Sequence, residues 1–275
     1  FRFRIRRKME HDIVPVCDPR AFGAWLDEHT DSKSGTPGSS QGHDAIPYDV
    51  DDLYFLYTLV RNSCAISVLE YGSGWSTLAL SRALSENRAS FGDAYDLEHP
   101  NPFELLSVDA SEDWQTVAMN RLPRDYRGLV TMCLAPCKLI DYAGQVASEF
   151  DGVPAFTPDV VYLDSPDPQQ VTGQLLGTDG SCLNDIPIAA DLLIREFSLW
   201  PGSVVVLDGR TSNARFLHQN FRRNWQWLHD PFGDRTVFRL DESPLGWKSL
   251  SHTYFRARAA RETRGLKQSA INDFS

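Results

Sequence analysis

The stretch SVLEYGSGWSTLALSRAL, residues 67–84, decides the fold. It reads as an apolar strand, a turn that contains Gly72 and Gly74, and then an amphipathic helix. Glycine lets the backbone approach a ligand closely, and the first turn of a helix presents unpaired N–H groups. This order of elements is typical of nucleotide sites in α/β proteins, although a purely structural strand-to-helix turn has the same form.

After this stretch, short β-branched runs alternate with helical patterns, which predicts an α/β fold with a doubly wound, mostly parallel sheet and helices on both faces. We expect strands at residues 67–71, 105–109, 129–133, 160–164 and 203–208. Helices are expected at residues 76–85, 114–121, 141–149, 186–200 and 213–223. An antiparallel hairpin of residues 225–229 and 236–240 would end the sheet.

The chain divides into three parts by composition. Residues 1–45 are expected to form an N-terminal arm, with a helix at residues 19–28 and then a flexible linker whose Ser and Gly content leaves almost nothing to bury. Residues 46–245 form the expected catalytic domain, which opens with a helix at residues 49–61. We interpret the arginine-rich tail, residues 246–275, as a solvated helix face.

Charge and composition exclude several classes of partner. The formal net charge of -10 opposes the positive field that a nucleic acid requires. No apolar run approaches the roughly 20 residues of a membrane-spanning helix, and residues 1–8 lack the apolar core of a secretory signal. Five scattered cysteines do not resemble a disulfide framework. We therefore expect a cytoplasmic protein that acts on a small molecule, and a homo-oligomer is compatible with these properties.

The turn also allows a nicotinamide-dependent oxidoreductase. In the dinucleotide fingerprint G-x-G-x-x-G, however, the third glycine would fall at Thr77, where close packing of helix against strand favours no side chain. The acidic residue that ends the next strand, Asp109, lies well beyond the usual spacing of roughly 20 residues. Both observations count against a dinucleotide site.

The pattern of Glu70, Gly72, Gly74 and Ser76 resembles the first motif of the class I S-adenosylmethionine-dependent methyltransferases. The run Gly-x-Gly-x-Ser-Thr is similar to the variant in the branch of the macrocin O-methyltransferase type. The resemblance covers about residues 46–241 through its order of strands. It implies a Rossmann-like, seven-stranded sheet whose last strand is antiparallel, and S-adenosylmethionine as the cofactor.

This resemblance implies a role for each residue of the turn. Gly72 and Gly74 would let the backbone meet the methionine part, and Glu70 would organise the turn or hold the amino group. Trp75, a less specific candidate, would lie over the cofactor unless it belongs to the core, as aromatic residues at helical spacing more often do. Asp109 would accept the two ribose hydroxyls, since its two oxygens can bind adjacent O–H groups. The implied cofactor site comprises Glu70, Gly72, Gly74, Trp75, Ser76, Thr77, Asp109 and Asp164.

Two further carboxylates end successive strands in VVYLDSPDP and VVVLDGR, at Asp164 and Asp208. Such ends meet at the crevice where α/β proteins bind ligands, although either aspartate could instead cap a helix. One carboxylate could accept the proton of a substrate hydroxyl, or the pair could hold Mg²⁺ with Asn213 as a third ligand. Against a metal, Gly209 and Arg210 follow Asp208 where another oxygen ligand is expected.

The hypothesis that fits these features best is an S-adenosylmethionine-dependent methyltransferase with Asp164 and Asp208 as catalytic residues. Its acceptor would be a hydroxyl of a small molecule or sugar. Two alternatives stay open: an NAD(P)-dependent oxidoreductase, and a noncatalytic nucleotide-binding module, because a fold by itself does not establish activity.

Overall fold

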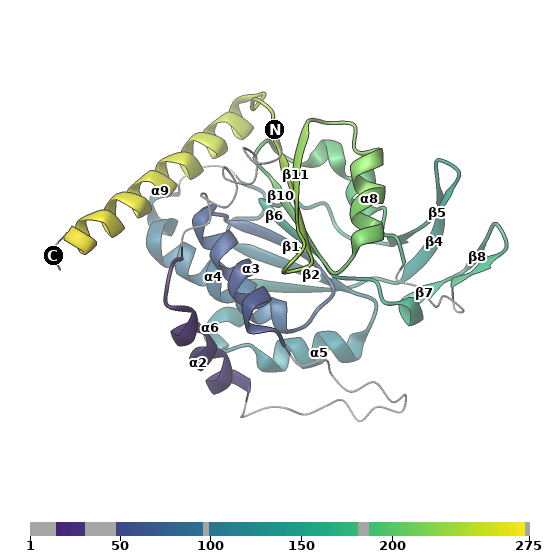
Figure 1. Cartoon of the computed structure of the whole chain (residues 1–275), viewed down its shortest axis with the longest axis horizontal. Coiled ribbons are helices and arrows are strands. Elements are labelled where there is room, and N and C mark those ends of the chain that lie inside the picture. Colours follow the sequence, from purple (N-terminus) through teal and green to yellow (C-terminus); the bar gives the residue numbers. More distant parts are fainter. Residues whose placement is uncertain (1–14, 31–47, 96–98, 181–186, 273–275) are drawn as a thin grey trace.

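A seven-stranded sheet forms the centre of the molecule (Figure 1). The computed structural model describes residues 15–30, 48–95, 99–180 and 187–272. Within the sheet the order is β11-β12-β10-β6-β1-β2-β3. Its strands are β1 (Ser67–Tyr71), β2 (Glu104–Asp109), β3 (Val130–Leu134), β6 (Val160–Leu163), β10 (Val204–Asp208), β11 (Trp225–Asp230) and β12 (Arg235–Leu240). The first five run parallel, and β12 pairs antiparallel with both β10 and β11. The predicted doubly wound α/β fold with an antiparallel terminal hairpin is confirmed.

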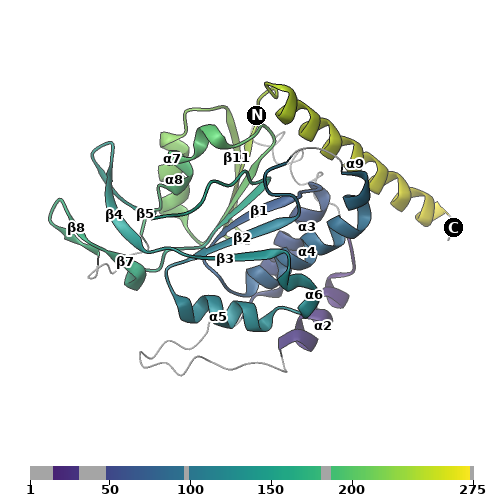
Figure 2. The ribbon, with the colours of Figure 1, turned by 180° about the vertical axis from the view of Figure 1, so that it is seen from behind.

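Helices cover both faces of this sheet (Figures 1 and 2). One face carries α2 (Pro19–Thr30), α3 (Val50–Asn62), α4 (Trp75–Phe91), α5 (Glu112–Arg121) and the short α6 (Arg124–Arg127). The opposite face carries α7 (Asp191–Ile194) and α8 (Thr211–Asn220). Single 3₁₀ turns lie at η1 (Gly92–Ala94), η2 (Pro168–Gln170) and η4 (Glu196–Ser198).

Successive side chains along each strand point to opposite faces of the sheet, so the strands contribute to two hydrophobic cores. In β1, Val68 packs into the core under α3 and α4, whereas Leu69 packs into the core under α7 and α8. All five residues of β1 are buried, as expected for a central parallel strand whose two faces are both covered.

The expected helix at residues 19–28 forms as α2 and packs against the main domain. Phe22 and Leu26 of α2 are fully buried in the core that contains α3 and α4. The Arg82 guanidinium of α4 lies 4.2 Å from the centre of the Trp25 ring, a cation–π contact that adds to this burial. The expected linker, residues 30–44, lies almost wholly outside the described residues.

The prediction of a helix at residues 141–149 was wrong. This segment is the hairpin of β4 (Cys137–Tyr142) and β5 (Gln145–Phe150), and β4 also pairs with β7 (Val171–Thr172). Ala143 and Gly144 turn the chain with φ of 53° and 80°, and the Gly144 N–H donates to Asp141 Oδ1 at 2.6 Å. A two-residue turn with both φ values positive is the geometry that joins antiparallel strands.

The helix expected at residues 186–200 is much shorter than predicted. Residue 186 lies outside the described residues, and only α7 is α-helical in the remainder. The Ser148 N–H donates to Ile188 O at 2.7 Å, and the Ala190 N–H donates to Ser148 O at 2.9 Å. Pairing with β5 therefore holds the start of this segment extended, and tertiary contacts override its helical pattern.

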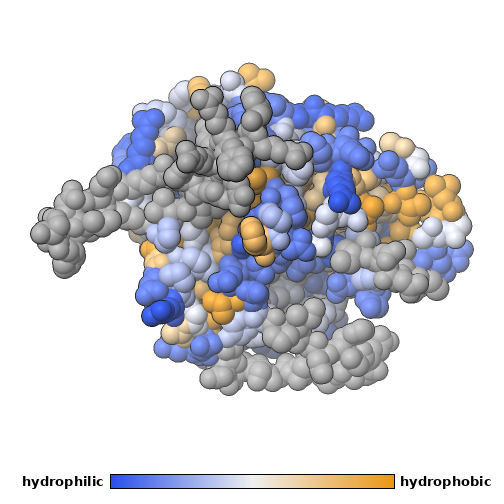
Figure 3. Space-filling model, in the orientation of Figure 1, coloured by the Kyte–Doolittle hydropathy of each residue, from blue (hydrophilic) through white to orange (hydrophobic). Residues whose placement is uncertain are grey.

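Two antiparallel hairpins project from one side of the body in Figures 1 and 2. They are β4–β5 and the pair β8 (Gln174–Leu175) and β9 (Thr178–Asp179). Apolar patches gather toward this side in the space-filling view of Figure 3. Leu176, at the turn of the second hairpin, is 67% exposed.

Helix α9 (Trp247–Asn272) follows the sheet and runs past the body at its C-terminal end (Figure 1). The interpretation of the tail as a solvated face fails at Arg256, whose guanidinium donates to the buried Asp159 at 2.8 Å. Arg258 does lie on an exposed face, with its side chain 65% exposed.

None of the described helices combines the length and the apolar character that crossing a bilayer requires. In the described part of the chain, Cys17, Cys133 and Cys137 are free thiols.

Candidate functional site

Four neighbouring strands end at one edge of the sheet, and each carries predicted site residues. In spatial order these are Asp208 at the end of β10, Asp164 after β6, the turn 72–74 after β1, and Asp109 at the end of β2. Leu207 pairs with Leu163, so Asp208 and Asp164 follow matched positions on adjacent parallel strands. The chain reverses its direction of winding between β1 and β6, the place where doubly wound sheets bind ligands.

Glu70 lies fully buried beneath the turn and collects three hydroxyl groups. Ser76 donates to its Oε1 at 2.6 Å, while Thr77 and Ser107 donate to Oε2 at 2.7 and 2.6 Å. Burial raises the pKa of Glu70 to about 7, and the three hydroxyl donors oppose that rise. Glu70 is therefore placed to organise the turn, one of the two roles that the sequence suggested.

The glycines of the turn meet different surroundings. Gly72 has φ of 101°, and a Cβ built on it would lie 3.0 Å from Ser165 Cβ, so the turn requires glycine there. At Gly74 a Cβ would meet no atom within 4 Å. Gly74 precedes α4, and its N–H donates to Thr77 Oγ1 at 3.0 Å. The Cα of Gly74 therefore faces open space.

Asp109 points toward the same turn. Its Oδ2 accepts the Ser73 N–H at 2.8 Å, and its Oδ1 accepts the Ser111 N–H at 2.8 Å and the Gln170 amide at 2.9 Å. Burial raises the pKa of Asp109 above its usual value, and the two N–H groups oppose the rise. Ser111, not Asp109, caps α5 by accepting from the Trp114 N–H. The carboxylate thus lies beside the turn that contains Gly72 and Gly74, and its role as the ribose acceptor stays a prediction.

Trp75 begins α4 and contacts residues outside the turn. The Arg121 guanidinium lies 3.5 Å from the centre of its ring, and the Tyr48 ring packs edge-on at 5.1 Å. Arg121 is 7% exposed, and burial lowers its pKa to about 10, which leaves it charged at neutral pH. One face of the Trp75 ring is therefore already covered by a cation that the sequence analysis did not identify.

Asp164 follows β6 at this edge of the sheet, and 53% of its side chain is exposed. The surrounding protein raises its pKa above the usual range; Arg210 opposes this rise, and Asp208 reinforces it. Arg210 Nε lies 3.8 Å from Asp164 Oδ1, close enough for attraction but not for a hydrogen bond. The same guanidinium donates to Asp164 O and Pro166 O, both at 2.9 Å. Arg210 thus clamps the chain that follows β6.

Asp208 lies beside a second cation. The Tyr162 O–H donates to Asp208 Oδ2 at 3.4 Å. Burial and the nearby carboxylate of Asp52 raise the pKa of Asp208 to about 6, and Arg235 opposes them. Arg235 is engaged elsewhere, at 3.3 Å from both Asp52 and Asp230. The hydrogen bond from Tyr162 is a long and weak one for Asp208.

The third metal ligand that the sequence suggested does not reach this crevice. Asn213 is 1% exposed, and its amide exchanges two hydrogen bonds with the Ala189 backbone at 2.9 and 3.0 Å. Among the described residues, no group of three or more His, Cys, Asp or Glu side chains is arranged to hold a metal ion. With Arg210 beside Asp164, the donor set does not fit Mg²⁺, which prefers several oxygen ligands.

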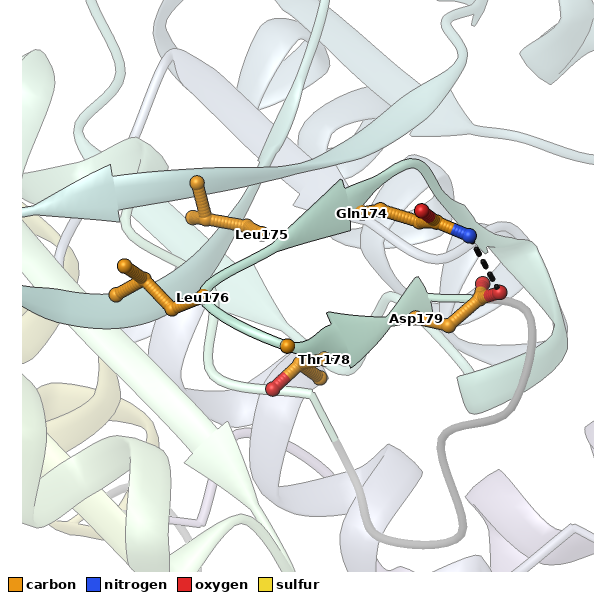
Figure 4. Close-up of a pocket in the computed structure, with 6 residues that line it drawn as sticks. Gln174, Leu175, Leu176, Thr178 and Asp179 are labelled. Atoms are coloured by element: carbon orange, nitrogen blue, oxygen red, sulfur yellow. Dashed lines mark hydrogen bonds between the residues drawn. The ribbon is translucent and has the colours of Figure 1, made fainter.

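A separate shallow pocket lies in the projecting hairpin of β8 and β9 (Figure 4). Residues 174–179 line it, and the Gln174 amide donates to Asp179 Oδ2 at 3.2 Å. The pocket contains none of the predicted site residues. It is a feature of the hairpin turn and is separate from the predicted site.

Comparison of the whole chain with solved structures finds methyltransferases at low sequence identity. No protein-family model matches the chain, and no curated protein matches it. A methyltransferase from Podospora anserina with bound S-adenosylhomocysteine matches at TM-score 0.47 and 11% identity, over 87% of this chain and 94% of that one. The O-methyltransferase TomG from Streptomyces achromogenes, involved in tomaymycin synthesis and solved with S-adenosylmethionine, matches at TM-score 0.39 and 16% identity, over 84% and 92%.

An O-methyltransferase from Bacillus cereus in complex with S-adenosylhomocysteine matches at TM-score 0.40 and 14% identity, over 82% of this chain and 100% of that one. Likenesses of this size give no argument about residues or substrates. The sheet order and strand directions of this chain establish its doubly wound α/β fold without reference to these structures.

Proposed function

We propose that this chain is an S-adenosylmethionine-dependent methyltransferase that modifies a hydroxyl of a small molecule or sugar. The observation that carries the proposal is the turn 72–74, which is anchored on the buried Glu70, open at Gly74 and adjacent to the Asp109 carboxylate. These residues fit a nucleoside with a charged amino-acid arm. The open backbone admits the arm, and the carboxylate accepts from the sugar.

The bound cofactor would supply an electrophilic methyl group on a sulfonium. The chain's own task is then to hold an acceptor oxygen in line with that group and to take its proton. Asp164 and Asp208 stand at neighbouring strand ends beside the turn, and the pKa of each lies above the usual range. A carboxylate with a raised pKa is a stronger base than an ordinary one and is still largely ionised at neutral pH when its pKa is about 6.

An NAD(P)-dependent oxidoreductase would use the same type of sheet. Thr77 argues against it, because this side chain is fully buried, caps α4 and bonds to Glu70, where the dinucleotide turn has glycine. A noncatalytic module would bind the nucleoside without turnover, so a binding assay and a turnover assay together separate the three readings.

The test of the proposal is selective stabilisation by ligands. S-adenosylhomocysteine should raise the melting temperature and NAD should not, since a ligand that binds only the native state stabilises it. Asp109→Ala and Gly72→Val should lose this response. The matched variants Asp113→Ala and Gly144→Val change an exposed carboxylate and a glycine with open surroundings, and they should keep it. Stabilisation by NAD alone would reject the proposal.

A further inference from the structure

The side chain of Gln170 donates a hydrogen bond to the Asp109 carboxylate, which the proposed cofactor needs as an acceptor. Gln170 ends η2, 61 residues after Asp109 in the chain, and its amide N–H donates to Asp109 Oδ1 at 2.9 Å. Its own carbonyl oxygen accepts the Asp167 N–H at 2.9 Å and the Ser165 hydroxyl at 3.3 Å. One amide thus ties the end of β2 to the loop that follows β6.

The hydrogen bond from Gln170 uses one of the acceptor positions of the Asp109 carboxylate. A carboxylate oxygen accepts two hydrogen bonds in its plane. Oδ1 of Asp109 already accepts from Ser111 and Gln170, whereas among the described residues Ser73 is the one donor to Oδ2. A ribose offers two adjacent hydroxyls, one for each oxygen. By this count of acceptor positions Asp109, which is 2% exposed, can accept one hydroxyl while Gln170 stays in place, and a second competes with the Gln170 amide.

The backbone is fixed on both sides of Gln170. The Gln170 side chain can therefore rotate while the loop keeps its position. On one side Arg210 grips the carbonyls of Asp164 and Pro166. On the other, Val171 is 1% exposed and pairs with Cys137 in the sheet of β4 and β7. Rotation of the half-buried Gln170 side chain is therefore enough to release Oδ1.

From this arrangement we propose that Gln170 is an internal competitor for the cofactor's ribose: its amide stands in for one sugar hydroxyl on Asp109 and must rotate away when the nucleoside binds. This inference rests on the proposed function. It assigns Gln170 a part in setting cofactor affinity. The ribose hydroxyl must replace an existing hydrogen bond on Oδ1, so it adds less binding free energy than it would if Oδ1 had that acceptor position free.

The test is calorimetric titration of the full chain with S-adenosylhomocysteine at pH 8. Gln170→Ala should bind about fivefold more tightly than the wild type, which is the size of one net hydrogen bond. Gln170→Glu keeps the acceptor for the Asp167 N–H but loses the donor to Asp109, so it should also bind more tightly while preserving the loop. Gln169→Ala alters an exposed neighbour and should leave the affinity unchanged.

Two analogues, the 2′-deoxy and 3′-deoxy forms of S-adenosylhomocysteine, show whether the gain belongs to the ribose. With at least one of them, Gln170→Ala should lose its advantage over the wild type, because the competing hydroxyl is missing. Equal or weaker binding of S-adenosylhomocysteine by Gln170→Ala would overturn the inference, and so would an equal gain with both analogues. Absence of binding by the wild type and every variant would instead reject the proposed function itself.

Discussion

Asp159 and His252 form a buried hydrogen-bonded pair that ties the last helix to the sheet at the start of β6. His252 Nε2 lies 2.7 Å from Asp159 Oδ1, and both side chains are at most 3% exposed. Arg256 donates to the same oxygen at 2.8 Å, and the Ile66 N–H donates to Oδ2 at 2.8 Å. Burial alone would raise the pKa of Asp159, but Arg256 and His252 reverse the effect and hold it well below its usual range.

The first prediction concerns this anchor of α9. Asp159→Asn keeps an acceptor for the Ile66 N–H but removes the charge, which leaves the Arg256 guanidinium and the buried His252 without their partner. Breaking a buried pair costs about 3–5 kcal/mol, so urea unfolding should show a loss of that order. Amide hydrogen exchange in α9 should accelerate at the same time.

A matched control for α9 is Arg258→Ala. It breaks an ion pair with Glu262 whose side chains are 65% and 59% exposed. Exposed pairs contribute about 0–1 kcal/mol, so stability should hardly change. If Asp159→Asn were as mild as this control, the tie between α9 and the sheet would not be structural.

The second prediction concerns the pH dependence that Glu70 imposes. Its pKa is about 7 in the folded chain against a reference of 4.5, so between these values the folded state holds a proton that the unfolded state has released. Stability must then fall as pH rises through this window, by on the order of 3 kcal/mol.

Glu70→Gln isolates this effect, because an amide resembles the protonated carboxyl and does not titrate. Chemical unfolding at pH 5 and at pH 8 should show the wild type losing stability relative to Glu70→Gln. A parallel pH dependence of the two proteins would mean that Glu70 is ionised throughout and that its three hydroxyl donors offset its burial.

The third prediction concerns Gly72. Alanine there must adopt φ of 101° and place its Cβ 3.0 Å from Ser165 Cβ, so two penalties act together. Gly144→Ala is the matched control: its φ of 80° is also positive, but nothing lies within 4 Å of the added Cβ. The control should cost about 1–2 kcal/mol from the backbone alone, and Gly72→Ala more. Equal losses in thermal unfolding would show that the loop after β6 gives way.

The fourth prediction concerns the two carboxylates of the crevice. Asp164→Asn or Asp208→Asn should lower transfer of a labelled methyl group to a panel of phenols and glycosides by about 10²–10⁴-fold, the usual contribution of a general base. Cofactor binding should be largely spared. If Asp208 is the base, the rate should rise with pH and level off above its pKa of about 6. Asp151→Asn, in an exposed pair with Lys138, is the control, and unchanged turnover in both crevice variants would reject their catalytic role.

Much of the fold could be predicted because the strands of the sheet have recognisable local sequence patterns. Each central strand is a short, predominantly apolar run, and β1 forms at the residues expected, Ser67–Tyr71. The β4–β5 hairpin was missed because Tyr142, Val146 and Phe150 also recur at helical spacing. The signal against a helix was Gly144 three residues after Asp141, an Asx-type turn that the structure uses.

Part of the candidate site also followed from sequence, since residues that end parallel strands must meet at one edge. This placed Asp109, Asp164 and Asp208 together. The contacts of Gln170 and Arg121 could not be predicted. Gln170 reaches Asp109 across 61 residues, and Arg121 meets Trp75 only because α4 and α5 pack side by side. Such pairs depend on three-dimensional packing and leave no local pattern.

The central claim is that the glycine turn receives a sulfonium nucleoside while Asp109 takes its ribose. A crystal structure with S-adenosylhomocysteine measures this directly. We expect the Asp109 carboxylate within hydrogen-bond distance of both ribose hydroxyls, the amino-acid arm over Gly74, and the sulfur facing Asp164 and Asp208. A ligand bound elsewhere, or a ribose that does not touch Asp109, would contradict the account.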